Sequence, residues 1–124
     1  MAKILIVDDE EDLLDLLRDS LKLKKHEVVT AQNGSEALTY AELNRDIDLV
    51  ITDLHMPVMD GDYMCEQIYK IEDFKNLPVF VISAEKNQRY VDIANDMAKP
   101  VRYFKKPFNL KEVLAAIDEV VAGK

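Results

Sequence analysis

The 124 residues of this chain suffice for one compact domain with a sizeable core and are too few for two typical domains. Hydrophobic residues make up 48% and charged residues 32%, values that are ordinary for a folded protein and exclude a disordered or fibrous chain. The net charge of −8 opposes binding to nucleic acid or to an anionic membrane. No apolar run approaches the ~20 residues that span a bilayer, so we expect a single cytoplasmic domain over residues 1–124.

Five short segments rich in branched and aromatic residues are predicted to be strands. They are residues 3–7, 27–31, 48–52, 78–82 and 101–104. The first, third and fourth are almost continuously apolar, as expected of parallel strands that are covered on both faces. The second and fifth are more mixed, so we expect them at the two edges of the sheet.

Segments with helical periodicity lie between and after these strands. One apolar stripe at helical spacing runs from Leu13 to Leu21, and another runs from Leu110 to Val121. Residues 85–99 are the least apolar of the helical candidates, so their helix is expected to be the least firmly packed. Five strands that alternate with five helices predict a three-layer α/β domain with right-handed crossovers.

Residues at the expected helix ends support these boundaries. Asn33 and Asn109 each precede a glutamate by three residues, which is typical of an N-cap, and they predict helix starts near residues 34 and 110. The first helix is expected to end near Lys25, where no glycine is available. Either Lys25 or His26 must then adopt the left-handed conformation, or the helix ends differently.

Carboxylates follow two of the predicted central strands. Asp8 and Asp9 come directly after the first strand and Asp53 directly after the third. In parallel sheets ligands bind beyond the carboxyl ends of the strands, so these acids are expected to converge there. Like charges ~4 Å apart repel by about 1 kcal/mol in water and about 4 kcal/mol at an effective dielectric near 20, so folding should raise the pKa of at least one of them. A hard cation such as Mg²⁺ would compensate the repulsion; the alternative is that the acids only favour the following helix N-terminus.

Complementary groups follow the last two strands. Ser83 comes after the fourth strand and Lys106 just beyond the fifth. Taken singly, a serine here is more often a turn residue and a lysine a solvated charge. Together with the acids, a hydroxyl and an ammonium at the same rim indicate phosphoryl transfer.

The whole chain resembles a response regulator receiver domain. The motifs VDDE, VITDLHMPVMDG, ISAE and YFKKPF occur in the order and spacing of that family. The resemblance implies a three-layer, flavodoxin-like (βα)5 fold, in which a doubly wound parallel five-stranded sheet has the strand order 2-1-3-4-5. It also implies a phosphorylation-operated switch of a two-component or phosphorelay system.

The resemblance assigns roles around the acids. Asp53 would accept a phosphoryl group from a phosphohistidine on a sensor histidine kinase or a histidine phosphotransfer protein. Asp9 and Asp53 would bind Mg²⁺ directly, and Asp8 would act largely through water. His55 would supply its backbone carbonyl to the metal, while the side chains of His55 and Glu85 would tune the lifetime of the phosphate.

The resemblance also assigns the switch. Ser83 would bond the phosphoryl group, Lys106 would pair with it, and Tyr103 would move inward when Ser83 is drawn toward the phosphate; the alternative for Tyr103 is an aromatic that only packs on a helix. The helix from about Asn87, the fifth strand and the last helix would form the output face. The peptide bond between Lys106 and Pro107 is expected to be cis.

Two rival readings come from other classes of protein. A small phosphatase of the haloacid dehalogenase kind also places a nucleophilic aspartate after a strand, but it needs a second aspartate two residues later, where this chain has His55. A degenerate receiver would only bind partners, and the complete set of acids, serine and lysine argues against it. We therefore expect a switch whose only reactions are on itself, acting on a downstream protein or a fused effector domain.

Overall fold

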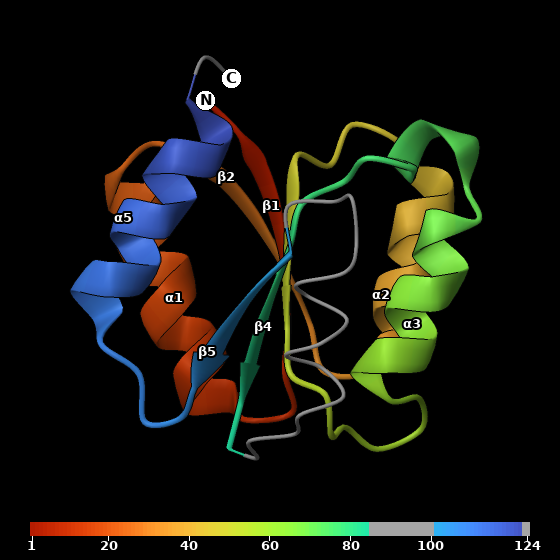
Figure 1. Cartoon of the computed structure of the whole chain (residues 1–124), viewed down its shortest axis with the longest axis horizontal. Helices are drawn as coiled ribbons and strands as arrows, with labels where there is room; N and C mark the ends of the chain where they lie inside the picture. The colour runs from red at the N-terminus through yellow and green to blue at the C-terminus, as the bar shows by residue number, and fades with distance from the viewer. Residues whose placement is uncertain (85–100, 123–124) are drawn as a thin grey trace.

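The computed structural model describes residues 1–84 and 101–122, which form a parallel sheet between two layers of helices (Figure 1). The strands are β1 (Lys3–Val7), β2 (Glu27–Ala31), β3 (Leu49–Thr52), β4 (Val79–Ser83) and β5 (Val101–Lys105). The helices are α1 (Glu11–Leu23), α2 (Gly34–Leu43), α3 (Gly61–Tyr69) and α5 (Leu110–Val121), with a short 3₁₀ turn, η1 (Glu72–Phe74). The sequence did not predict that turn.

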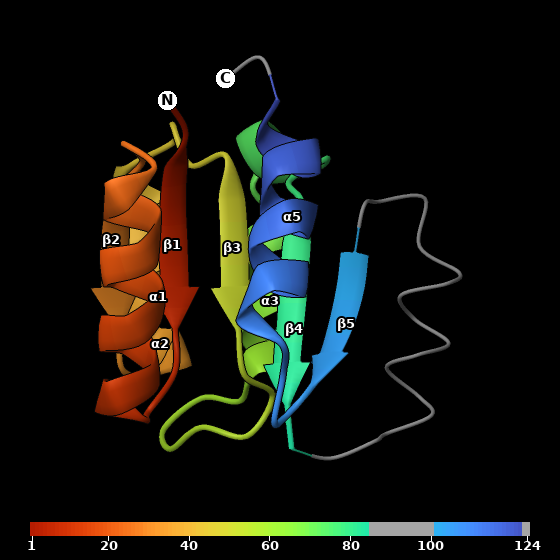
Figure 2. The same ribbon diagram turned by 90° about the vertical axis from the view of Figure 1, so that its left-hand side faces the viewer.

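The strands are arranged in the order β2-β1-β3-β4-β5, and each neighbouring pair is parallel (Figure 2). This confirms the expected fold class and strand order. The two mixed strands, β2 and β5, are the edges, as predicted. Strand boundaries differ by one residue: β3 begins at Leu49, β4 is shifted by one residue to Val79–Ser83, and β5 runs on to Lys105.

The sheet is apolar because it is covered on both faces. Leu5 and Val7 of β1 belong to a core cluster that includes residues of α2 and α3. Ile4 and Ile6 belong to the other cluster, which includes residues of α1 and α5. Successive side chains of a strand point to opposite faces, so a continuous apolar run can supply both cores. Figure 1 shows α1 and α5 on one side of the sheet and α2 and α3 on the other.

Both predicted asparagine caps are confirmed. Asn33 Oδ1 accepts a hydrogen bond from the backbone N–H of Glu36 at 2.8 Å. Asn109 Oδ1 accepts bonds from the N–H groups of Lys111 at 2.9 Å and Glu112 at 3.3 Å. Each cap satisfies donors that the first turn of a helix leaves without an intrahelical partner.

Helix α1 ends at Leu23, and Lys25 takes the left-handed conformation with φ of 66°. The N–H of Lys25 donates to the carbonyl of Lys22 at 2.9 Å, and the N–H of His26 donates to that of Leu21 at 3.2 Å. This pair of bonds is the Schellman motif, which glycine normally completes. The sequence prediction that Lys25 or His26 adopts this geometry is confirmed for Lys25.

Replacing Lys25 with glycine is expected to stabilise the protein by about 0.5–1 kcal/mol, because a side chain with Cβ strains the left-handed conformation. The measurement is urea unfolding of wild type and Lys25→Gly. Lys24→Gly is the matched control: Lys24 has φ of −87°, so glycine there relieves no strain and should lower stability. Equal effects of the two substitutions would refute the explanation.

The helix predicted from about Asn87 and the proposed lifetime residue Glu85 lie outside the described residues. Within residues 1–84 and 101–122, no helix is both long enough and apolar enough to cross a membrane.

Cys65 is a free thiol that is partly buried against the core on the α2–α3 side. Its side chain therefore contributes to packing.

Candidate functional site

Three charged residues stand one position beyond the ends of their strands: Asp8 after β1, Asp53 after β3 and Lys106 after β5. Their backbone N–H groups donate to the carbonyl of the last residue of the neighbouring strand, at 3.1, 3.1 and 2.8 Å respectively. The ladder of the sheet therefore continues for one more residue into the site. This fixes the backbone of each charged residue and brings the three together at the carboxyl end of the sheet.

The ammonium of Lys106 joins three carboxylates. Its Nζ lies 3.0 Å from Asp53 Oδ2, 3.1 Å from Asp8 Oδ2 and 3.1 Å from Glu10 Oε1. The side chains of Asp8, Asp53 and Lys106 are 3%, 10% and 14% exposed, whereas that of Glu10 is 61% exposed. Burial lowers the pKa of Lys106, but its hydrogen bonds to the three carboxylates raise it more, so the net pKa lies above its ordinary value.

The two oxygens of Asp53 have different surroundings. Oδ1 accepts hydrogen bonds from the backbone N–H groups of Leu54 at 2.6 Å and His55 at 3.3 Å. Oδ2 accepts its bond from Lys106 at 3.0 Å. The backbone amides thus orient the carboxylate, while the side-chain cation reaches its other oxygen.

Asp8 is held by main-chain and side-chain donors. Its Oδ1 accepts the N–H of Glu10 at 2.8 Å, and its Oδ2 accepts from Lys106. Burial raises the pKa of Asp8 from 3.8 to about 6, against the opposing effect of these hydrogen bonds, and the charge of Asp53 adds to the rise. The sequence predicted a raised pKa among the acids, and this is confirmed for Asp8. The main cause is burial, with carboxylate repulsion contributing less.

The raised pKa of Asp8 predicts how the free energy of unfolding of the metal-free protein changes with pH. The protonated acid favours folding, so this contribution is present below about pH 4 and is lost as pH rises through about 6. We expect Asp8→Asn, which carries no charge, to gain about 1–3 kcal/mol relative to wild type between pH 4 and pH 7.5. Urea unfolding of both proteins at the two pH values measures this. A stability difference that does not vary with pH would contradict it.

Asp8, Glu10 and Asp53 form a group that could hold a metal ion, with one oxygen of each within 4.8 Å of the others. Asp9 is exposed and is not in this group. Glu10 was not among the site residues predicted from the sequence. Its signal was its place directly after two acids in VDDE, but its contact with Lys106 spans 96 positions of sequence.

Three further predicted site residues, Ser83, Tyr103 and His55, belong to the described part of the chain. Ser83 is fully buried at the end of β4 and is paired in register with Lys105. Tyr103 is half-buried and packs against the core on the α2–α3 side. His55 is exposed. The peptide bond between Lys106 and Pro107 is cis, as the resemblance implies.

The loop between β3 and α3 is packed closely against the site. A Cβ on Gly61 would overlap the carbonyl oxygen of Asp53, and one on Gly34 would lie 2.7 Å from the carbonyl oxygen of Met59. Val58 has φ of 72°, and the N–H of Met59 donates to the carbonyl two residues earlier at 2.8 Å. These features form a tight turn. Gly61 lets the start of α3 lie against the backbone of Asp53, and Gly34 lets the start of α2 lie against Met59 of the loop.

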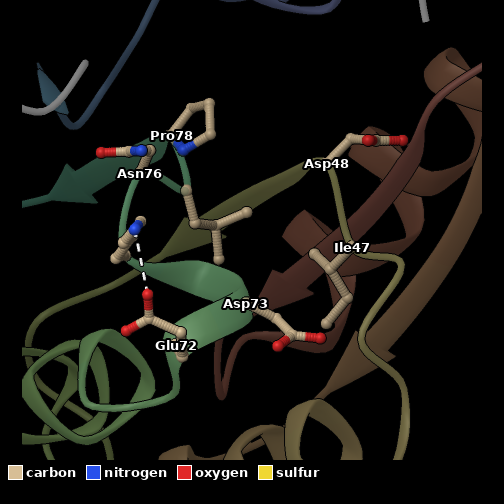
Figure 3. A pocket seen from close by; sticks show the side chains of 8 residues that line it. Ile47, Asp48, Glu72, Asp73, Asn76 and Pro78 are labelled. Atoms are coloured by element: carbon tan, nitrogen blue, oxygen red, sulfur yellow. Dashed lines mark hydrogen bonds and ion pairs between the residues drawn. The ribbon is translucent and has the colours of Figure 1, made fainter.

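A separate hollow of about 210 Å³ lies at the opposite end of the sheet (Figure 3). Its lining includes Asp48 and Pro78, which directly precede β3 and β4, and Lys75, which is paired with Glu72 at 2.9 Å. Asp53 follows the other end of β3. This hollow is therefore not part of the carboxylate site.

The comparisons with known proteins agree with this geometry. The family model described as "Response regulator receiver domain" matches residues 4–118. The chain is 32% identical over 119 residues to the alkaline phosphatase synthesis transcriptional regulatory protein PhoP of Bacillus subtilis, covering 96% of the chain and 48% of PhoP. The chain spans about half, or less, of the first curated relatives that it matches.

Solved structures show the same likeness. The non-phosphorylated HemR receiver domain of Leptospira biflexa matches with a TM-score of 0.88 and 31% identity, over 100% of this chain and 97% of that one. Response regulator TrrA of Thermotoga maritima, solved in complex with Mg²⁺-BeF, matches with a TM-score of 0.81 and 30% identity, over 98% and 100%. With acids and a lysine gathered at the carboxyl end of a 2-1-3-4-5 sheet and a family match over nearly all of its length, the chain belongs to the receiver domain family of two-component response regulators.

Proposed function

We propose that Asp53 is the phosphoacceptor of this receiver domain. The observation that carries the proposal is a carboxylate on a residue only 7% exposed, oriented by two backbone amides and bound by an ammonium 3.0 Å away. A carboxylate fixed in this way is positioned to attack phosphorus. The donor we propose is a phosphohistidine on a sensor histidine kinase or a histidine phosphotransfer protein.

In the proposed reaction, an Asp53 oxygen forms a bond to phosphorus while the phosphorus–nitrogen bond of the phosphohistidine breaks. The bonding electron pair leaves with the imidazole, which takes up a proton. Lys106 lies where its ammonium can bind a phosphoryl oxygen on Asp53, because it already contacts Oδ2. We assign Ser83 as the hydroxyl donor to the same group. In the domain's own dephosphorylation, water would form a bond to phosphorus while the bond to the Asp53 oxygen breaks, which releases inorganic phosphate and restores the carboxylate; His55 and Glu85 would tune the rate of this hydrolysis.

The same pocket fits Mg²⁺. Its oxygens come from carboxylates and lie within 4.8 Å of one another, and hard cations prefer such ligands. Within that group we propose Asp53 as a direct ligand, with Asp8 acting largely through water. Asp9, which lies outside the group, and the backbone carbonyl of His55 are the further direct ligands that the family resemblance implies. Bound Mg²⁺ would neutralise charge on the acids and on the transferred group.

We propose that Ser83 and Tyr103 relay the modification to the surface. Val81 of β4, two residues before Ser83, is paired in register with Tyr103 of β5. Ser83 and Tyr103 therefore lie on neighbouring paired strands, and we propose that a movement of Ser83 toward a phosphoryl group is passed from β4 to Tyr103 on β5. The proposed output face comprises β5, α5 and the helix expected from about Asn87.

The output partner is a downstream protein or a fused effector domain. The matched relative PhoP is a transcriptional regulatory protein about twice as long as its match, which supports the second arrangement. With a net charge of −8, this chain alone is not expected to bind nucleic acid or an anionic membrane. We propose that the phosphoryl transfer to this domain takes place in the cytoplasm.

The test is phosphorylation by acetyl phosphate, followed by intact mass spectrometry. We expect Mg²⁺-dependent addition of one phosphoryl group, lost on treatment with hydroxylamine because an acyl phosphate is cleaved by it. The matched control is the same incubation with excess chelator. No addition, or addition that is equal without Mg²⁺ and resists hydroxylamine, would contradict the proposed function.

A further inference from the structure

Glu10 lies at the rim of the pocket, between Lys106 and solvent. Its backbone is fixed, because its N–H donates to Asp8 Oδ1 at 2.8 Å and its carbonyl accepts from Leu14 at 3.1 Å. It occupies the N-cap position of α1, yet its side chain makes no capping hydrogen bond. That side chain instead reaches Lys106 at 3.1 Å.

This contact saturates the ammonium of Lys106. A lysine ammonium has three N–H donors, and here one oxygen each from Asp8, Glu10 and Asp53 lies within 3.1 Å of Nζ. A phosphoryl oxygen that binds Lys106 must therefore displace one of these partners. The Asp8 side chain is 3% exposed, whereas that of Glu10 is 61% exposed. The Asp53 side chain is only 10% exposed, so Glu10 alone of the three can move into water, and it is the partner that the phosphoryl oxygen displaces.

We propose that Glu10 is a positioning residue that holds Lys106 in the unphosphorylated pocket and competes with the phosphoryl group for its ammonium. This inference rests on the proposed function, because it concerns the phosphoryl group on Asp53. Two effects of Glu10 act in the same direction. It occupies a donor that the phosphoryl oxygens need, and its negative charge repels the incoming anionic phosphodonor.

The test compares Glu10→Gln with Glu11→Gln and wild type. Glu11 is the neighbouring acid, is also exposed, and carries the same charge one position further along α1. Each protein is first titrated with Mg²⁺, since loss of an acid at the rim is expected to weaken metal binding. The rate of phosphorylation by acetyl phosphate is then measured by intact mass at saturating Mg²⁺, so that metal affinity and rate are separated.

We expect Glu10→Gln to be phosphorylated about 3- to 10-fold faster than wild type, the effect of removing one charge a few ångströms from a transferring phosphoryl group in a largely solvated site. Glu11→Gln should stay within about twofold of wild type, because an exposed charge that does not hold Lys106 has little effect.

Equal rates for the two variants, or a Glu10→Gln rate at or below that of wild type, would overturn the role of Glu10. A purely structural role would lower the melting temperature of Glu10→Gln without raising the rate, which would also overturn it. Failure of wild type to be phosphorylated is a different result, because that outcome contradicts the proposed function itself.

Discussion

Asp53→Asn is expected to lose phosphorylation by acetyl phosphate by at least about a thousandfold, because the neutral amide is not a nucleophile. The fold should survive the change. An asparagine has the same shape, and its oxygen can still accept the backbone N–H groups that now orient Oδ1. The measurement is intact mass after incubation with acetyl phosphate and Mg²⁺.

Asp60→Asn is the matched control for that substitution. Asp60 is an exposed acid in the loop after β3, and its side chain makes no capping hydrogen bond to α3. We expect it to be phosphorylated at the wild-type rate. If Asp53→Asn kept a hydroxylamine-sensitive phosphoryl group at the wild-type level, Asp53 would not be the phosphoacceptor.

Gly61→Ala is expected to destabilise the protein by about 2–4 kcal/mol, because overpacking against backbone forces the surrounding structure to shift. The new Cβ would overlap the carbonyl oxygen of Asp53 and lie 3.0 Å from its carbonyl carbon and 3.1 Å from Thr52 Oγ1. None of these atoms is the end of a flexible chain. Since the backbone of Asp53 must move, the rate of phosphorylation should also fall.

Gly34→Ala provides the comparison. Its Cβ would lie 2.7 Å from the backbone oxygen of Met59 and 3.0 Å from Cβ and Cγ of the same residue, a less severe contact than at Gly61, and Cγ can rotate away. We expect a smaller loss of stability and little change in the phosphorylation rate. Urea unfolding and the acetyl phosphate assay measure both effects. A Gly61→Ala protein as stable and as reactive as wild type would show that this close approach is not needed.

Much of the fold could be predicted because the relevant signals are local. Continuous apolar runs identified the strands that are covered on both faces, and the mixed compositions of β2 and β5 identified the edges. The two asparagine caps fixed helix starts at Gly34 and Leu110. The absence of glycine after α1 placed the left-handed residue near Lys25.

What the sequence could not predict depends on contacts that are formed only in the folded chain. In the sequence, Glu10 is indistinguishable from an ordinary acid at a helix start. Its contact with Lys106 forms only when the fold places the two residues side by side. The raised pKa of Asp8 was expected from repulsion between acids, but burial, which no local pattern gives, is its main cause. The left-handed conformation of Val58 likewise has no local signal, because a branched residue disfavours it.

The most direct test that Asp53 is the phosphoacceptor is to locate the phosphoryl group in the chain. Borohydride reduces an acyl phosphate on aspartate to the alcohol, so the phosphorylated residue becomes homoserine. Cleavage after Arg45 and Lys70 would place Asp53 in a peptide separate from the one that carries Asp8 and Asp9, and fragmentation of each peptide by mass spectrometry locates the change. We predict homoserine at position 53 only, and only after treatment with acetyl phosphate and Mg²⁺. Homoserine at position 8 or 9, or at another aspartate with Asp53 unchanged, would contradict the proposal that Asp53 is the phosphoacceptor.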